Sequence, residues 1–181
     1  LYVFLRTWLS RSWNARVLAG RGESAIPYLH VRDAVSAIAV LVDDPSLPAS
    51  GEVFMLGPDG ATSHRELFDA ATREVSGRPT RPIMLPRPVC RLGIRARCAI
   101  GDFVGVPPFE RPWMGRYIDR QLAVDARQTR RRLGWEPRPR LAILRRLPFL
   151  LENKLTHPLD WQRLNLAAMR TISLVAAISR L

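Results

Sequence analysis

Apolar residues recur at helical spacing after Asp33, on one face of a segment that ends near Pro45. The residues on that face are Val35, Ile38, Ala39, Leu41 and Val42. We expect Asp33 to cap this helix, because its carboxylate can accept from the free N–H groups of the first turn. The pattern therefore predicts one amphipathic helix in the first third of the chain.

Short apolar runs predict strands around that helix. Val17-Leu18 precedes the turn Gly20-Arg21-Gly22, and Ile26 to Leu29 forms a second extended segment. Val53 to Leu56, bounded by Gly51 and Gly57, predicts a compact buried strand. Helical and extended segments therefore alternate, which is typical of an α/β protein.

Ser63 is predicted to be the N-cap of a helix, because Glu66 follows it three residues later in the pattern of a capping box. The helix is expected to end at Gly77, and its apolar face is expected to hold Leu67, Phe68, Ala71 and Val75. Proline recurs from Pro79 to Pro88, so that stretch is predicted to be extended and exposed.

Three more helices are predicted in the second half of the chain. They cover Val89 to Ile100, a short segment capped by Asp125 and closed at Gly134, and Leu141 to Leu151. No internal repeat is visible.

A tail follows from 153 to 181, where Asp160 is expected to cap an amphipathic helix that begins with Trp161. Arginines interrupt its apolar positions, which argues against a membrane-spanning segment. Such a helix can lie on an anionic membrane surface, dock a partner helix or a second copy in a homodimer, or pack on its own domain. The sequence leaves these alternatives open.

The net charge is +12, from 28 basic and 16 acidic residues, and Lys154 is the single lysine. The arginines are scattered apart from Arg130-Arg131-Arg132. Since phosphate tracking requires charge gathered on one face, this distribution argues against nucleic-acid binding. Cys90 and Cys98 match neither a zinc nor a redox motif, so we expect them reduced, in a cytoplasmic protein.

Four short motifs follow one another in a characteristic order. They are Pro27 to Asp33, Gly51 to Gly57, Ser63 to Leu67, and Asp125 leading into Leu133-Gly134-Trp135-Glu136-Pro137. In this order the motifs resemble the C-terminal part of the extended short-chain dehydrogenase/reductase superfamily, the NAD-dependent epimerase/dehydratase proteins. The resemblance implies the substrate-side part of a Rossmann-type α/β fold over residues 1–152, with 153–181 as an added helical tail.

The resemblance also implies NAD or NADP as cofactor, but the residues for it are missing. No G-x-x-G-x-x-G occurs, and Gly20-Arg21-Gly22 is followed by neither a third glycine nor a helical pattern. The family's Tyr-x-x-x-Lys pair is absent, because Tyr28 and Tyr117 have Arg32 and Gln121 at the lysine position. We therefore expect no catalytic, cofactor-binding or metal-binding residue here, and no hydride transfer by this chain alone. The missing initiator methionine suggests a start inside a longer reading frame.

The candidate substrate-side residues are Tyr28, His30, Arg111 and Trp113. Arg111 occupies the place of an arginine that contacts substrate phosphates in nucleotide-sugar members, although the matching first arginine is replaced by Ile26. The long segment from Cys90 to Trp113 is more similar to the apolar substrate cap of the reductase and steroid-dehydrogenase branches. Each of these residues also has a simpler structural explanation. Tyr28 could be a packed tyrosine and His30 a hydrogen-bonded structural histidine. Arg111 could be a solvated arginine and Trp113 a core tryptophan.

Three functions remain for the chain. The first is the substrate-binding part of an NAD(P)-dependent epimerase, dehydratase or reductase that acts on a small-molecule substrate. The second is a non-enzymatic binding or scaffold module derived from the same fold. The third, suggested by the charge and the tail, is a basic peripheral membrane protein.

Overall fold

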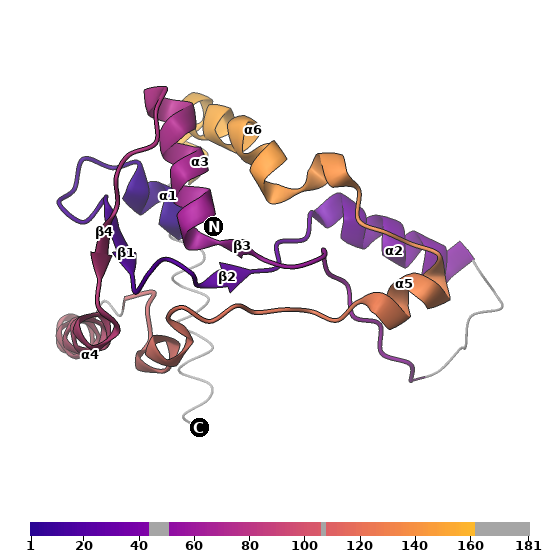
Figure 1. Cartoon of the computed structure of the whole chain (residues 1–181), viewed down its shortest axis with the longest axis horizontal. Helices are drawn as coiled ribbons and strands as arrows, with labels where there is room; N and C mark the ends of the chain where they lie inside the picture. Colours follow the sequence, from indigo (N-terminus) through magenta and orange to yellow (C-terminus); the bar gives the residue numbers. More distant parts are fainter. Residues whose placement is uncertain (44–50, 106–107, 162–181) are drawn as a thin grey trace.

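The computed structural model describes residues 1–43, 51–105 and 108–161. Most of these residues belong to helices that are joined by short strands and loops (Figure 1). The helices are α1 (Tyr2–Trp8), α2 (Val31–Asp43), α3 (His64–Ser76), α4 (Arg87–Val104), α5 (Arg127–Leu133) and α6 (Ile143–Thr156). Two 3-10 helices, η1 (Pro112–Tyr117) and η2 (Pro139–Leu141), lie between them.

The described strands form two small sheets. β1 (Val17–Ala19) pairs in parallel with β4 (Ile83–Leu85), and β2 (Ala25–Ile26) pairs antiparallel with β3 (Thr62–Ser63). The proline-rich stretch from Pro79 to Pro88 is largely extended, as its composition predicts, because it contains β4; only its last two residues belong to α4. The prolines of this stretch lie outside the three paired residues, Ile83 to Leu85. The composition therefore does not predict that these residues pair in parallel with β1.

The first core lies among α1, α3 and α6, with β1 beside them (Figure 1). The capping box that the sequence predicts is present: Ser63 Oγ accepts from the Glu66 N–H, and the Glu66 carboxylate accepts from the Ser63 N–H. α3 ends at Gly77 in the left-handed region, as expected. The buried members of this core are Leu5, Trp8, Leu18, Leu67, Phe68, Ala71, Leu147, Leu151 and Trp161.

Val75 does not belong to the first core, contrary to the sequence-based expectation. Its side chain is on the last turn of α3 and remains 53% exposed. Helical spacing predicted the correct face for Leu67, Phe68 and Ala71, but the packing of that face does not reach the last turn of α3 at Val75.

The second core is smaller and lies between α2 and α5, at the other end of the long axis (Figure 1). Ala37, Leu133 and Trp135 are buried there, and the partly buried Phe54 and Leu56 pack against them. Trp135 fills this core beside the Gly134 turn, and Gly134, where the sequence predicts the helix to close, is left-handed.

The predicted strand from Val53 to Leu56 is wrong. The segment has no strand assignment, and Val53 is exposed. Phe54 and Leu56 face the second core while the Met55 N–H donates to Thr129 Oγ1 at 2.9 Å. The apolar pattern arises because alternate side chains face the second core. The hydrogen bond to the Met55 N–H, however, comes from a residue of the helix α5 and not from a neighbouring strand.

Asp33 is not the cap of α2. His30 precedes the helix, and its Nδ1 accepts from the Arg32 N–H at 3.1 Å, so His30 performs the capping role. Asp33 is instead buried in the first turn, where it binds Arg138. Asp125 is not the N-cap of α5 either, because that position is Ala126, although the Asp125 carboxylate does accept from the Arg127 N–H at 3.1 Å.

Two further predictions concern the cysteines and the tail. Cys90 and Cys98 are both free thiols, as expected, and Cys98 is buried. Residues 158–161 are already helical, so Asp160 lies within that helix and does not cap it. The rest of the predicted tail helix lies outside the described residues.

Candidate functional site

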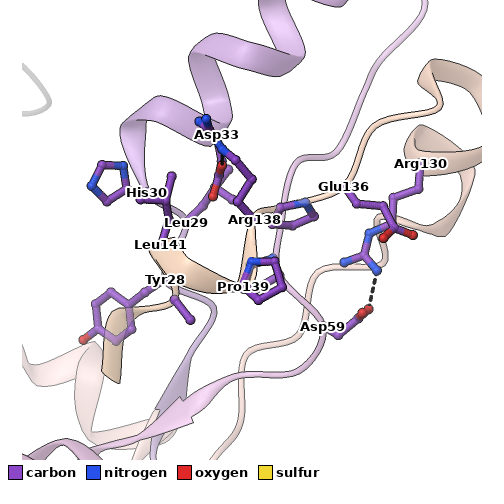
Figure 2. A pocket seen from close by; sticks show the side chains of 13 residues that line it. Tyr28, Leu29, His30, Asp33, Asp59, Arg130, Glu136, Arg138, Pro139 and Leu141 are labelled. Carbon is purple, nitrogen blue, oxygen red and sulfur yellow. Dashed lines mark hydrogen bonds and ion pairs between the residues drawn. The ribbon is translucent and has the colours of Figure 1, made fainter. Parts of the chain in front are cut away.

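A cavity of about 240 Å³ opens between the N-terminus of α2 and the segment that contains η2 (Figure 2). Tyr28, His30 and Asp33 line it from the α2 side. Across from them the lining comes from Asp59, Arg130, Glu136 and Arg138. Segments more than 100 residues apart in the chain therefore meet at one hollow.

An ion pair joins the two sides of the cavity. Arg138 Nε donates to Asp33 Oδ1 at 2.8 Å, and a second guanidinium nitrogen of Arg138 donates to the Arg32 carbonyl at 2.9 Å. The side chain of Asp33 is only 3% exposed, whereas that of Arg138 is 38% exposed. A carboxylate buried to this extent is stable only when it is paired, so Arg138 holds η2 against the start of α2.

Arg130 projects from α5 to the opposite rim. One terminal nitrogen of its guanidinium contacts Asp59 Oδ1 at 2.6 Å, and the other donates to the Gly57 carbonyl at 3.1 Å (Figure 2). Its Nε is buried and has no hydrogen-bond partner among the described residues. Because the side chain of Asp59 is 89% exposed, this ion pair can be exchanged for another anion at modest cost.

His30 and Tyr28 lie on the other side of the cavity from Arg130 (Figure 2). The capping bond fixes His30 Nδ1 as an acceptor, so the neutral ring carries its proton on Nε2. Tyr28 packs against the first core, and its hydroxyl is buried without a hydrogen-bond partner. Desolvation by this burial raises the pKa of the Tyr28 phenol, which stays neutral.

Arg111 and Trp113 do not line this cavity. They lie at the start of η1, which packs against α4. The Trp113 ring is largely exposed and meets the Tyr117 ring edge to face, with centroids 6.0 Å apart. The structure thus brings together two of the four residues that the sequence predicts, Tyr28 and His30.

The sequence does not predict a role in the site for the charged residues of the cavity. Glu136 belongs to a motif that the sequence analysis had already identified, and Arg138 follows that motif directly. The sequence feature that could have identified these two residues is their position shortly after the Gly134 turn. Nothing local points to Asp59 or to its pairing with Arg130, 71 residues away.

The Gly20-Arg21-Gly22 turn does not fit the pyrophosphate of a dinucleotide. The Asp119 carboxylate occupies this turn and accepts from the N–H groups of Arg21 and Glu23 at 2.8 and 3.2 Å. A Cβ on Gly20 would meet that carboxylate, so glycine is needed for the carboxylate rather than for a phosphate. Arg87 neutralises Asp119 from α4, and this contact and the two N–H groups hold the Asp119 pKa below its usual range in spite of desolvation.

The described ranges contain no group of three histidine, cysteine, aspartate or glutamate residues that could hold a metal ion. Within the same ranges, none of the helices has the length and apolar content needed to cross a membrane.

No protein-family model matches the sequence, and no curated protein matches it. A search of solved structures finds similarity to the crystal structure of gox2253, with 16% sequence identity and a TM-score of 0.49. The match covers 79% of this chain and 40% of that chain, so the sequence spans less than half the length of that protein.

Proposed function

We propose that this chain is the substrate-side part of an NAD(P)-dependent epimerase, dehydratase or reductase, and that a small-molecule substrate binds in the cavity beside α2. One observation carries the proposal. Three of the four sequence motifs, which are far apart in the chain, pack into a single unit that borders this cavity.

Side-chain contacts join the segments in which these motifs lie. Trp135 Nε1 donates to Ser36 Oγ at 2.8 Å, and Arg138 holds Asp33. The Met55 N–H donates to Thr129 Oγ1, which ties the second motif to α5. These contacts fix the positions of the three motifs around the cavity.

The lining of the cavity favours a neutral, hydroxyl-rich substrate. The charges of Asp33 and Arg138 cancel, as do those of Asp59 and Arg130, which leaves the exposed Glu136 as an acceptor. The exposed Asp59 carboxylate is a second possible acceptor, whereas Tyr28 O–H and Arg130 Nε are buried out of reach of a ligand. Carboxylates bind hydroxyls by hydrogen bonds and fix their orientation.

Under this proposal the chain binds and orients the substrate, and residues outside these 181 hold the dinucleotide. The cofactor would supply the hydride when bound. The Asp119-filled turn described above takes no part in this, because its N–H groups already have an anionic partner.

The experiment is a fluorescence titration of NADH and NADPH against the 181-residue chain and against a chain extended upstream in its reading frame. We expect binding by the extended chain alone. In the extended chain, Glu136→Gln should leave cofactor binding unchanged, because Glu136 faces the substrate cavity. Failure of the extended chain to bind either nucleotide would contradict the proposal.

A further inference from the structure

α4 shows its apolar face to solvent. At 100° per residue, the exposed apolar residues occupy about 140° of the helix circumference. These residues are Val89, Leu92, Gly93, Ala96, Ala99, Ile100, Phe103 and Val104, and we refer to them as the α4 apolar face. Phe103 is 93% exposed. No charged residue interrupts this face.

The opposite side of α4 packs against the protein through small residues. Cys98 and Gly101 are buried there, and Cys98 Sγ donates to the Glu110 carbonyl at 3.1 Å. Gly115 of η1 lies against the side chain of Arg91, whose Nε donates to the Gly115 carbonyl. The usual arrangement of a surface helix, apolar inward and polar outward, is therefore reversed.

Arginines border the α4 apolar face on both sides. Arg95 lies along one edge and forms no ion pair with any of the described residues, and Arg97 lies along the other, where it pairs with Glu110. α4 contains four arginines and one acidic residue, Asp102. Residues 87–120, which span α4 and η1, contain seven arginines and three acidic residues. The surroundings of the face are therefore basic.

We propose that α4 docks on an anionic lipid surface, with its apolar face in the boundary between headgroups and acyl chains. A basic amphipathic helix of this kind lies in the plane of the interface, where its apolar side chains leave water and its arginines meet lipid phosphates. α4 lies at one end of the molecule, away from α2 and α5, so the cavity stays clear of the membrane (Figure 1).

The charge and the shape of this surface favour lipid over a protein partner. The α4 apolar face offers no polar group that would set the register of a docked protein, and it belongs to a single convex helix. Long arginine stems beside it can reach headgroup phosphates while their methylenes stay on the apolar side.

α2 provides a matched control. Val31, Val35, Ile38 and Val42 form a similar exposed stripe on α2, but the exposed charged residues of α2 itself are one arginine and one aspartate, Arg32 and Asp43. If exposed apolar side chains alone caused lipid binding, both helices would contribute equally.

The test is co-sedimentation of the 181-residue chain with vesicles of phosphatidylcholine that contain roughly one third phosphatidylglycerol, compared with phosphatidylcholine alone. We expect binding to the anionic vesicles only, weakened by salt. Leu92→Gln with Phe103→Gln should lower the partition coefficient at least about tenfold. Arg95→Gln should lower it roughly fivefold. These side chains are exposed, so the circular dichroism spectra should not change.

Val35→Gln with Val42→Gln, the matched change on α2, should leave vesicle binding unaltered. Equal loss from the α2 and α4 variants, or no binding of the original chain to anionic vesicles, would overturn the proposal. It would also be overturned if the α4 variant abolished a dimer in sedimentation velocity while vesicle binding persisted. In that case a second copy of the chain would be the occupant.

Discussion

The two cores of this molecule are built by different forces. The first, among α1, α3 and α6, is a cluster of large apolar and aromatic side chains, with Phe68 and Leu67 fully buried. The second, between α2 and α5, has three buried hydrophobic residues and depends on polar contacts between distant segments. The cavity borders the second core.

Because of this difference, we expect the two cores to serve different purposes, one the stability of the fold and the other ligand recognition at the cavity. Apolar burial is non-directional and tolerates changes of shape, whereas a buried ion pair or a capped backbone group fixes one arrangement of its partners. We therefore expect the first core to determine whether the chain folds, and the second to determine how the cavity is shaped.

The largest expected effect is in the first core. Phe68→Ala removes a fully buried ring and should lower the free energy of unfolding by about 3–5 kcal/mol. Val75→Ala on the same helix should cost less than about 0.5 kcal/mol, because Val75 is exposed. Urea unfolding followed by circular dichroism would measure both, and equal losses would contradict the account of this core.

The ion pair of the second core comes next. Asp33→Asn should cost about 2–3 kcal/mol, less than a fully buried pair because Arg138 is more than one third exposed. Asp59→Asn, which breaks the exposed pair with Arg130, should cost about 0–1 kcal/mol. A double-mutant cycle with Arg138→Gln measures the coupling, and a coupling near zero would show that the pair does not hold η2.

His64 makes the first core sensitive to acid. Desolvation among Phe4 and Trp8, the largest cause, lowers the pKa of His64 to about 4. Between pH 6.5 and about 4 the unfolded chain therefore binds a proton that the folded chain does not, so stability falls as the pH falls, and it is constant above. After a discount for partial exposure the loss is roughly 2 kcal/mol.

The same loss should disappear in His64→Phe, which keeps an aromatic ring in the cluster. His157→Gln, a change at an exposed histidine, should retain it. Urea midpoints recorded between pH 7 and pH 4 would measure the effect. An unchanged pH dependence in His64→Phe would contradict the assignment.

The smallest effect is local. Ser63→Ala removes the hydroxyl that accepts from the Glu66 N–H and should cost about 1 kcal/mol. Ser76→Ala, at the exposed end of the same helix, removes no cap and should be nearly neutral. Thermal unfolding compares the two, and equal melting temperatures would remove the capping box from the account.

Structural features that depend on only a few neighbouring residues could be predicted from the sequence. The capping box at Ser63 and the helix ends at Gly77 and Gly134 all follow from local patterns and are present. Val53 to Leu56 was misread because an alternating pattern does not reveal whether its partner is a strand or, as here, Thr129 of a helix.

Only part of the lining of the cavity could be predicted from the sequence, because the rest depends on contacts between distant residues. Tyr28 and His30 lie in one motif, but Arg138 reaches Asp33 across 105 residues and Arg130 reaches Asp59 across 71. Pairings of this kind depend on how whole elements pack, and no local rule expresses them. Asp33 illustrates the point, since its position fits a cap until Arg138 is known to be its partner.

The most direct test of the difference between the two cores is native-state hydrogen exchange of the 181-residue chain. We predict that amides of α3 and α6 exchange only through global unfolding, and that those of α2 and α5 exchange through a smaller opening of lower free energy. Asp33→Asn should accelerate exchange in α2 and α5 while the free-energy gap to α3 widens. Equal protection in both regions, or uniform acceleration by Asp33→Asn, would contradict the claim that polar contacts hold the cavity region separately.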